Sequence, residues 1–247
     1  MSKLVLDSIA VDCPDAVALA EFYAKLLNVD NRGDFIYLPG EDVEIWFQEV
    51  EGYQPPTWPT QERGQQVHFE MVTNNIPAAV EHAISVGATK IEDQPDESEY
   101  TVMLDPVGHP FCMCTPFFNV PEPPHADTEV WIALAAITFD CPNGEELWKF
   151  YWQLADLRPQ DVGGMAPALV SDSGLMVLIQ QVEDYQPTTW PTQERGQQIH
   201  IDFHTDSREE MVAKAIELGA TQEDVERGFT VMKDPAGHPF CICDTKD

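Results

Sequence analysis

One stretch of the chain occurs twice, and this repetition limits the possible folds more than any other feature. "WPTQERGQQVH" begins at Trp58 and "WPTQERGQQIH" begins at Trp190, with Val67 replaced by Ile199. The duplication extends further, since "DCPDAVALAEFYAKLL" from Asp12 returns as "DCPNGEELWKFYWQLA", and "VMLDPVGHPFCMC" returns as "VMKDPAGHPFCIC". We therefore expect two copies of one structural unit.

The stretch between the copies has a different composition. "PFFNVPEPPHADTE" over 116–129 is rich in proline and acid and has no periodic apolar pattern, which is typical of a linker. The sequence therefore predicts a first domain over 1–115, a linker over 116–129 and a second domain over 130–247.

Composition and charge exclude several classes of function. The chain is 43% hydrophobic and carries 13 basic against 43 acidic residues, a formal charge of −30. Such a charge repels phosphate backbones and anionic lipids, so we expect no nucleic-acid partner. There is no apolar run of the roughly 18 residues that a membrane span needs, and no signal peptide is recognisable at the start. We expect a cytoplasmic protein with reduced cysteines.

Within each copy the apolar periodicity alternates between strand and helix. "LDSIAVD" alternates as a strand, and Asp12 is placed to cap a following helix with Pro14 in its first turn. Further strands, a Pro-rich crossing and a second strand–helix pair follow. In the second copy Ser207 and Glu210 form a possible capping box, and Gly219 is placed for the helix stop. The pattern predicts an α+β fold of antiparallel sheets with helices on one face.

Ordered motifs give the chain a family resemblance. A strand ending in "FQ", the segment "QQ-hydrophobic-H" and the closing "DP-x-GHPFC" resemble the glyoxalase-like branch of the vicinal oxygen chelate (VOC) superfamily. Its members include glyoxalases, extradiol dioxygenases, fosfomycin-modifying enzymes and bleomycin-binding resistance proteins. The resemblance covers both copies and implies two tandem glyoxalase-like domains, each of two βαβββ units forming cupped sheets around a cleft. Units could pair within a copy or across the linker, and the fold alone does not fix the chemistry.

The resemblance also implies where a metal would bind. Metal-dependent members take ligands from the first and the last strand of each unit. The matching first-strand positions here are Ser8, His68, Ala136 and His200, and the last-strand positions are Gln48, Cys112, Gln180 and Cys241. None of these is a carboxylate, so the usual ligand set is broken. We therefore expect no metal, no cofactor and no catalytic residue of the usual kind.

A His beside an acid could replace the missing set. His200, Asp202 and His204 share one strand face by their spacing of two, as do His68 and Glu70. Three successive same-face residues span about 13 Å and do not easily surround one ion. The preferred interpretation is a hydrogen-bonding His that orients a ligand.

Aromatic residues are expected around the same cleft. The strand alternation that directs Gln48 into the cleft also directs Trp46 there. The Pro-rich crossing between units adds Tyr53, Trp58, Tyr185 and Trp190. Two interpretations of this crossing remain open. Its indoles could plug the seam while Arg63 and Arg195 pair with acids, or the rings could stack on a flat ligand at the cleft mouth.

The remaining candidates have weaker signals. His109 and His238 follow "DPxG" and are expected as exposed turn residues. Cys112 and Cys241 lie on an apolar final strand, where buried, inert thiols are expected.

The sequence thus favours a metal-independent binding protein over an enzyme. By resemblance to the bleomycin-binding members, it would sequester an apolar, planar aromatic metabolite or antibiotic and so give resistance. The alternative is a glyoxalase-like isomerase, lyase or dioxygenase with an unusual metal or acid/base site. We expect a monomer with pseudo-dimeric domains or a homodimer. The candidate ligand-binding residues are Trp46, Gln48, Tyr53, Trp58, His68, Glu70, Cys112, Gln180, Tyr185, Trp190, His200, Asp202, His204 and Cys241.

Overall fold

The computed structural model describes residues 3–38, 43–58, 60, 62–92, 94, 100–116, 129–161 and 167–245. Most of the expected linker falls at 117–128, outside the described residues. The first copy contains β1 (Val5–Cys13), α1 (Ala16–Leu27), β2 (Phe35–Tyr37), β3 (Glu44–Glu49), β4 (Val67–Thr73), α2 (Ile76–Val86), β5 (Thr89–Lys90), β6 (Tyr100–Leu104) and β7 (Pro110–Cys114). The second contains β8 (Ile132–Cys141), α3 (Gly144–Leu154), β9 (Arg158–Gln160), β10 (Ala168–Val170), β11 (Met176–Gln181), β12 (Ile199–Thr205), α4 (Arg208–Glu217), β13 (Thr221–Glu226), β14 (Phe229–Lys233) and β15 (Pro239–Asp244).

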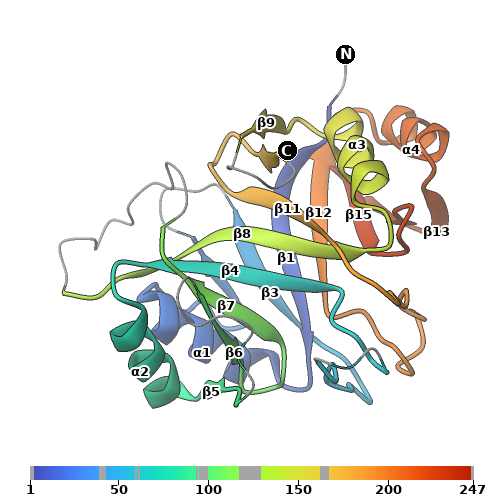
Figure 1. The fold of residues 1–247 in the computed structure, drawn as a ribbon. Helices are drawn as coiled ribbons and strands as arrows, with labels where there is room; N and C mark the ends of the chain where they lie inside the picture. Colours follow the sequence, from blue (N-terminus) through green and yellow to red (C-terminus); the bar gives the residue numbers. More distant parts are fainter. Residues whose placement is uncertain are drawn as a thin grey trace.

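Each sheet combines strands from both copies. A seven-stranded sheet has the order β13-β14-β15-β12-β1-β3-β2, and an eight-stranded sheet has the order β5-β6-β7-β4-β8-β11-β10-β9. β1 lies antiparallel to β12, and β4 lies antiparallel to β8. The strands of the two sheets run in crossing directions (Figure 1). The first unit of one copy therefore pairs with the second unit of the other, which answers the question that the sequence left open.

The predicted α+β class is confirmed, but the sheets are mixed where the sequence predicted antiparallel ones. β1 runs parallel to β3, and β12 runs parallel to β15. The eight-stranded sheet repeats this pattern in β8 with β11 and β4 with β7. A parallel neighbour needs a long crossover connection, and the helix of each unit lies within that connection.

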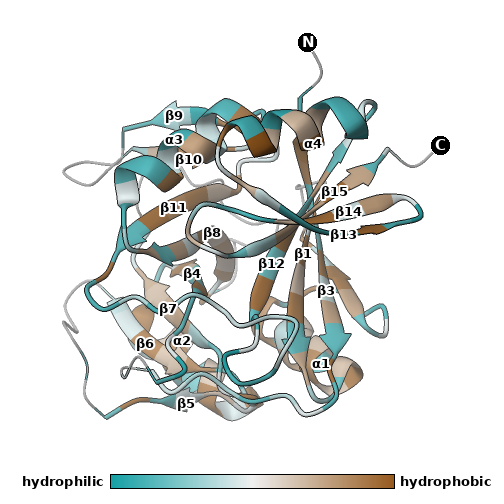
Figure 2. Ribbon diagram, turned by 90° about the vertical axis from the view of Figure 1, so that its right-hand side faces the viewer, coloured by the Kyte–Doolittle hydropathy of each residue, from teal (hydrophilic) through white to brown (hydrophobic). Residues whose placement is uncertain are grey.

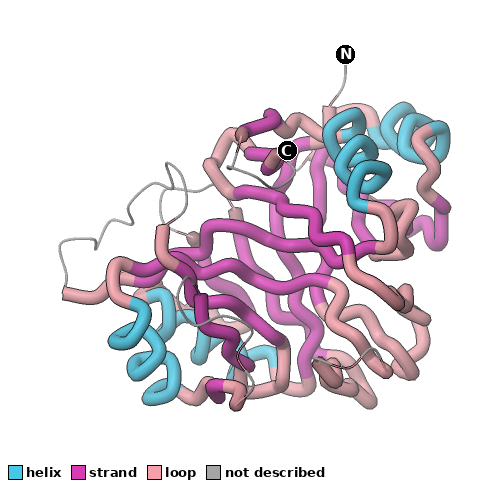
Figure 3. Tube along the Cα trace, in the orientation of Figure 1, coloured by secondary structure: helices cyan, strands magenta, loops and turns pink. Residues whose placement is uncertain are grey.

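The helices gather by copy, although the strands pair across copies. α1 contacts α2 and α3 contacts α4, so the two helix pairs lie at opposite ends of the molecule with the strands between them (Figure 3). Tyr23 of α1 stacks on Phe47 with ring centroids 5.3 Å apart and meets Phe69 edge-on at 5.8 Å. Hydrophobic residues run along the central strands, whereas the loops are mostly hydrophilic (Figure 2). One apolar core therefore joins helices and strands from both units of a copy.

Two predicted helix caps differ from the structure. Asp15, not Asp12, caps α1, since its side chain accepts a hydrogen bond from the Ala18 backbone N–H. Asp12 is only 1% exposed and still lies on β1. Ser207 occupies the N-cap of α4 without a side-chain capping bond. Among the described residues, every helix falls short of the length and apolar character that a bilayer span requires.

The described residues at the two ends of the repeated "WPTQERG" segment make the same hydrogen bonds in both copies. The Thr57 N–H donates to the Arg63 carbonyl at 2.7 Å, and the Arg63 N–H donates back to the Thr57 hydroxyl at 2.9 Å. The guanidinium of Arg63 donates to the Pro55 carbonyl at 2.9 Å. In the second copy the same bonds join Thr189, Arg195 and Pro187. The two arginines thus close a loop through backbone carbonyls, where the structural interpretation had expected them to pair with acids.

Candidate functional site

The "QQ" that follows each loop connects the two copies. Gln65 donates to the Asp140 carboxylate at 2.9 Å, and Gln197 donates to the Asp12 carboxylate at 3.1 Å. The Gln66 backbone N–H also donates to the Gln198 side-chain carbonyl, at 3.2 Å. These glutamines are buried. The repeated segment therefore builds a pseudo-symmetric junction at which each copy binds the first strand of the other.

The two carboxyl groups of the junction, those of Asp12 and Asp140, are buried, and burial opposes their ionisation. Burial raises the pKa of Asp12 to about 6, although His200 and the Gln197 hydrogen bond oppose the shift. Burial likewise raises the pKa of Asp140, against the influence of His68 and Gln65. A carboxyl group taken out of water favours its neutral form. Ionised acids at this junction therefore reduce the stability of the fold.

A cleft of about 830 Å³ opens on the face of the seven-stranded sheet. Its wall includes Ser8 of β1, Gln48 of β3, His200 of β12 and Cys241 of β15. These are the first- and last-strand positions of the two units that share this sheet. A volume of this size suits a small-molecule site.

Trp46 forms a fixed aromatic wall of the cleft. Its ring stacks on Phe35 with centroids 4.5 Å apart and an interplanar angle of 24°. Its indole N–H donates to the Glu44 carboxylate at 2.7 Å. A stacked and hydrogen-bonded indole has little freedom to lose when a ligand binds, so Trp46 is a preorganised surface for a flat ring.

A polar group lies in the same cleft beside Trp46. His200, Asp202 and Cys241 each offer a donor atom, and these atoms all lie within 4.8 Å of one another. Ser8 donates to Asp202 at 3.1 Å, while the His200 Nε2 lies 3.5 Å from an Asp202 oxygen. His200 Nδ1 and Asp202 Oδ1 are buried without a hydrogen-bond partner among the described residues. Buried polar atoms in proteins are almost always paired, so this group has capacity left for a ligand.

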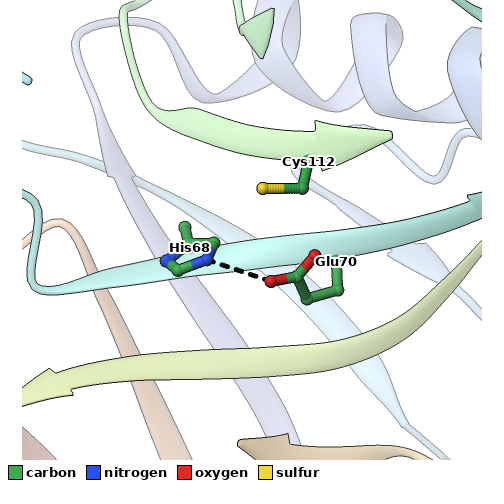
Figure 4. A group of neighbouring side chains, drawn as sticks. All are labelled: His68, Glu70 and Cys112. Carbon is green, nitrogen blue, oxygen red and sulfur yellow. Dashed lines mark hydrogen bonds and ion pairs between the residues drawn. The ribbon is translucent and has the colours of Figure 1, made fainter. Parts of the chain in front are cut away.

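The equivalent group in the eight-stranded sheet is closed upon itself. His68 Nε2 contacts Glu70 Oε1 at 3.1 Å, and the Gln65 amide contacts His68 Nδ1 at 3.1 Å. Glu70 also accepts hydrogen bonds from Cys114 at 3.1 Å and from Thr138 at 3.2 Å. Figure 4 shows His68 and Glu70 on one strand and Cys112 facing them from its neighbour. The polar atoms of this group are therefore bonded to one another to a greater extent than those of the open cleft.

The pKa values of His68 and Glu70 also favour the bond between these two side chains. Burial alone would lower the pKa of His68, but hydrogen bonds with Cys112 and Glu70 hold it well above its ordinary value. Burial would raise the pKa of Glu70, yet the His68 hydrogen bond holds it below its usual range. Together these shifts favour an imidazolium–carboxylate pair. In the open cleft, by contrast, burial and Asp202 raise the pKa of Cys241, which favours its protonated thiol.

Apolar replacements explain why the two faces differ. The positions of Asp7, Trp46 and His204 in the open cleft correspond to Ala135, Leu178 and Val72 on the other face. Ser8 likewise corresponds to an alanine. That face carries a second apolar cluster, which comprises Val72, Cys114, Trp131, Ala135, Ala136, Ala168 and Met176, with Tyr100, Cys112, Ala133, Val170 and Leu178 packed against it. The copies therefore share a fold but have different concave faces.

Two predicted ligand residues belong to buried networks instead of the cleft wall. Tyr53 contacts His109 Nε2 at 2.9 Å, and His109 Nδ1 contacts Asp105 at 2.8 Å. In the second copy Tyr185, His238 and Asp234 repeat this arrangement. His109 and His238 are 1% and 0% exposed, so the expectation of exposed turn residues was wrong. The sequence signal was present in the repeated "DPxGHP", but the tyrosine partners lie far away in the chain.

The two loop tryptophans also lie outside the wall of the cleft. Trp58 is half-buried. Trp190 is half-buried too, and Lys233 lies 5.7 Å from its ring centroid and donates to its carbonyl at 3.0 Å. Of the predicted residues, the structure brings six together around the 830 Å³ cleft: Trp46, Gln48, His200, Asp202, His204 and Cys241. Gln180 is exposed on β11. The ligand-binding role of all these residues stays a prediction.

The fold family implies a metal, and two groups have the donor chemistry to hold it: His68 with Glu70 and Cys112, and His200 with Asp202 and Cys241. An imidazole, a carboxylate and a thiol within 4.8 Å match the donors that Zn²⁺ accepts. The unpartnered Asp202 Oδ1 supports the fit. His200, Asp202 and Cys241 would then hold the ion, which would supply Lewis-acid chemistry. The resemblance had already matched His200 and Cys241, but sequence reasoning weighed Asp202 only with the histidines of its own strand and so did not join it to the cysteine.

Comparisons with known proteins define the class. The sequence profile of the family described as "Glyoxalase-like domain" matches residues 8–114 and 136–243. The chain therefore belongs to the glyoxalase-like domain family, as a tandem member of the VOC superfamily. A search of curated protein sequences finds no match.

Solved structures show the same fold at low sequence identity. A V278E mutant of glyoxalase I from Zea mays is 14% identical, with a TM-score of 0.66 over 98% of this chain and 93% of that one. Glyoxalase I from Zea mays is 15% identical, with a TM-score of 0.63 over 98% and 93%. A putative dioxygenase from Bacillus subtilis subsp. subtilis str. 168 is 12% identical, with a TM-score of 0.61 over 99% and 86%. These similarities establish the fold and leave the chemistry open.

Proposed function

We propose that the chain is a small-molecule-binding protein whose working site is the cleft on the seven-stranded sheet, and that it needs no metal to bind. The observation that carries the proposal is the contrast between the two polar groups. His200 and Asp202 retain unpartnered buried atoms beside a cleft of about 830 Å³, whereas His68 and Glu70 are mutually bonded. An open cleft with a rigid indole and a few convergent polar groups is the usual form of a ligand site.

The ligand of this proposal is planar and aromatic. Trp46 presents a fixed ring for stacking, which adds to the transfer of apolar area at about 25 cal/mol per Å². Gln48 and His200 lie where they can bind the polar edge of such a ring. The biological role would be sequestration of an antibiotic or toxic metabolite in the cytoplasm, as in the bleomycin-binding members. Both sheets are completed within one chain, which supports a pseudo-dimeric monomer.

A thermal-shift screen against planar natural products tests the proposal. The protein should be treated with a chelator and screened beside Trp46→Ala, Trp58→Ala and Trp190→Ala. We expect ligands that raise the melting temperature of the wild type and of the two loop variants, with at least a tenfold weaker affinity for Trp46→Ala. The proposal is wrong if the chelated wild type binds none of the compounds but turns over an α-keto thioester or a catechol.

A metalloenzyme is the second candidate, and the donor group His200, Asp202 and Cys241 favours it. In that case the chain would be an isomerase, lyase or dioxygenase whose chemistry depends on a bound ion. Elemental analysis of the purified protein separates the two candidates. One equivalent of metal per chain that is lost in Asp202→Asn but kept in Glu70→Gln would favour the enzyme, and substoichiometric metal in all three proteins would favour the binding protein.

A further inference from the structure

We infer that the ligand of the seven-stranded cleft carries a positive charge next to its ring. This inference rests on the proposed function and narrows it. Five acidic residues line the cleft, namely Asp7, Asp34, Glu49, Asp202 and Asp244, and the residues that line it include no lysine or arginine. A cleft of one sign concentrates ligands of the other sign.

Two of these acids are free to bind a ligand. Asp7 contacts His204 at 3.2 Å and Asp244 contacts Arg208 at 3.3 Å. A neighbouring basic side chain therefore partly offsets the negative charge of each of these two carboxylates. Asp34 and Glu49 are exposed on the rim and have no ion pair with any described residue. A cation that docks in the cleft meets these two carboxylates first.

The interior of the cleft has matching chemistry. Asp202 Oδ1 is buried and has no hydrogen bond with any described residue, although His200 Nε2 lies 3.5 Å away, and a carboxylate oxygen binds a charged hydrogen-bond donor more strongly than a neutral one. Trp46 lines the same cleft, and indole is the best aromatic partner for a cation. An anionic ligand would add to the negative charge of Asp202 and of the rim carboxylates.

The charge is specific to this cleft and does not simply follow from the acidic composition. On the face of the eight-stranded sheet, Asp7 and Trp46 correspond to Ala135 and Leu178. Both faces belong to the same chain with a formal charge of −30. Asp7 and Trp46 therefore have apolar counterparts on the other face, whereas the counterpart of Asp202 is Glu70, which is bonded to His68.

Three tricyclic probes of similar shape test the inference. N-methylacridinium is cationic, acridine is neutral at pH 8, and acridine-9-carboxylate is anionic. Binding is measured by quenching of tryptophan fluorescence in 150 mM salt with a chelator present, for the wild type and Trp46→Ala. We expect the cation to bind at least tenfold more tightly than acridine and the anion to bind most weakly. Trp46→Ala should weaken all binding.

A matched pair of variants separates local from overall charge. The double variant Asp34→Asn, Glu49→Gln should lower the affinity for the cation by about fivefold and leave the affinity for acridine unchanged. The double variant Glu183→Gln, Glu217→Gln removes the same amount of charge at exposed positions that do not line the cleft. It should change neither the affinity for the cation nor the affinity for acridine. Equal affinity of acridine and the cation, or equal loss in both double variants, overturns the inference while the binding function stands. If no probe binds, the inference and the proposed function fail together.

Discussion

Gln65 of the first copy donates a 2.9 Å hydrogen bond to Asp140 of the second, and Gln197 of the second copy donates a 3.1 Å bond to Asp12 of the first. Each copy thus contacts the first strand of the other through a buried side-chain amide, in addition to the pairing of the strands. This exchange explains why "WPTQERGQQ" is repeated so closely. The segment performs the same task on both sides of the pseudo-symmetric junction.

Loss of one such amide should destabilise the fold. Gln65→Ala removes a bond to Asp140, whose other oxygen is already unpartnered among the described residues. We expect the free energy of unfolding to fall by about 1–3 kcal/mol, measured by urea denaturation. Gln197→Ala should behave alike. Gln186→Ala, at an exposed position, is the control and should stay within about 0.5 kcal/mol of the wild type. A change that small in Gln65→Ala would mean that the Gln65 amide contributes nothing to stability.

Asp12 should make stability depend on pH. Its pKa is raised from 3.8 to about 6 in the folded protein, so the unfolded chain gives up the proton more readily. The cost of its ionisation is therefore fully present above about pH 6 and disappears as the pH falls toward 3.8. Asp12→Asn lacks this cost. Its stability relative to the wild type should decline by about 2 kcal/mol between pH 8 and pH 4. A difference that does not vary with pH would show that Asp12 is not shifted.

Tyr185→Phe should affect stability and leave ligand binding intact. The change removes the hydroxyl that contacts His238 at 2.9 Å, and the buried imidazole then lacks its partner. We expect a loss of about 1–2 kcal/mol in the free energy of unfolding with unchanged affinity in the screen. Tyr53→Phe is the matched variant in the first copy. A loss of affinity at unchanged stability would instead support the ligand-binding role that the sequence suggested for these tyrosines.

The duplicated units and the α+β class could be predicted from the sequence, because strand and helix periodicities depend on local residue order. The pairing of units across copies could not, since the same alternation fits either arrangement. The contact that distinguishes them joins Gln65 to Asp140, which are 75 positions apart. His109 escaped prediction for the same reason, because its partner Tyr53 is 56 positions away.

The candidate site was predictable only as a set of positions. Strand alternation placed Trp46 and Gln48 on one face, and the resemblance added His200 and Cys241. The difference between the open and the closed face depends on replacements such as Leu178 at the position of Trp46. The effect of such a replacement appears only when the four neighbouring strands are assembled.

Isothermal titration with a ligand selected by the thermal-shift screen tests the central claim most directly. Because the face with Trp46 combines, among the described residues, an open cleft with polar atoms that lack a hydrogen-bond partner, we predict one ligand per chain in the wild type. Binding should be lost in Trp46→Ala and kept in Leu178→Ala, the equivalent change on the closed face. Two equivalent sites per chain, or loss of binding in Leu178→Ala with Trp46→Ala unaffected, would contradict the account.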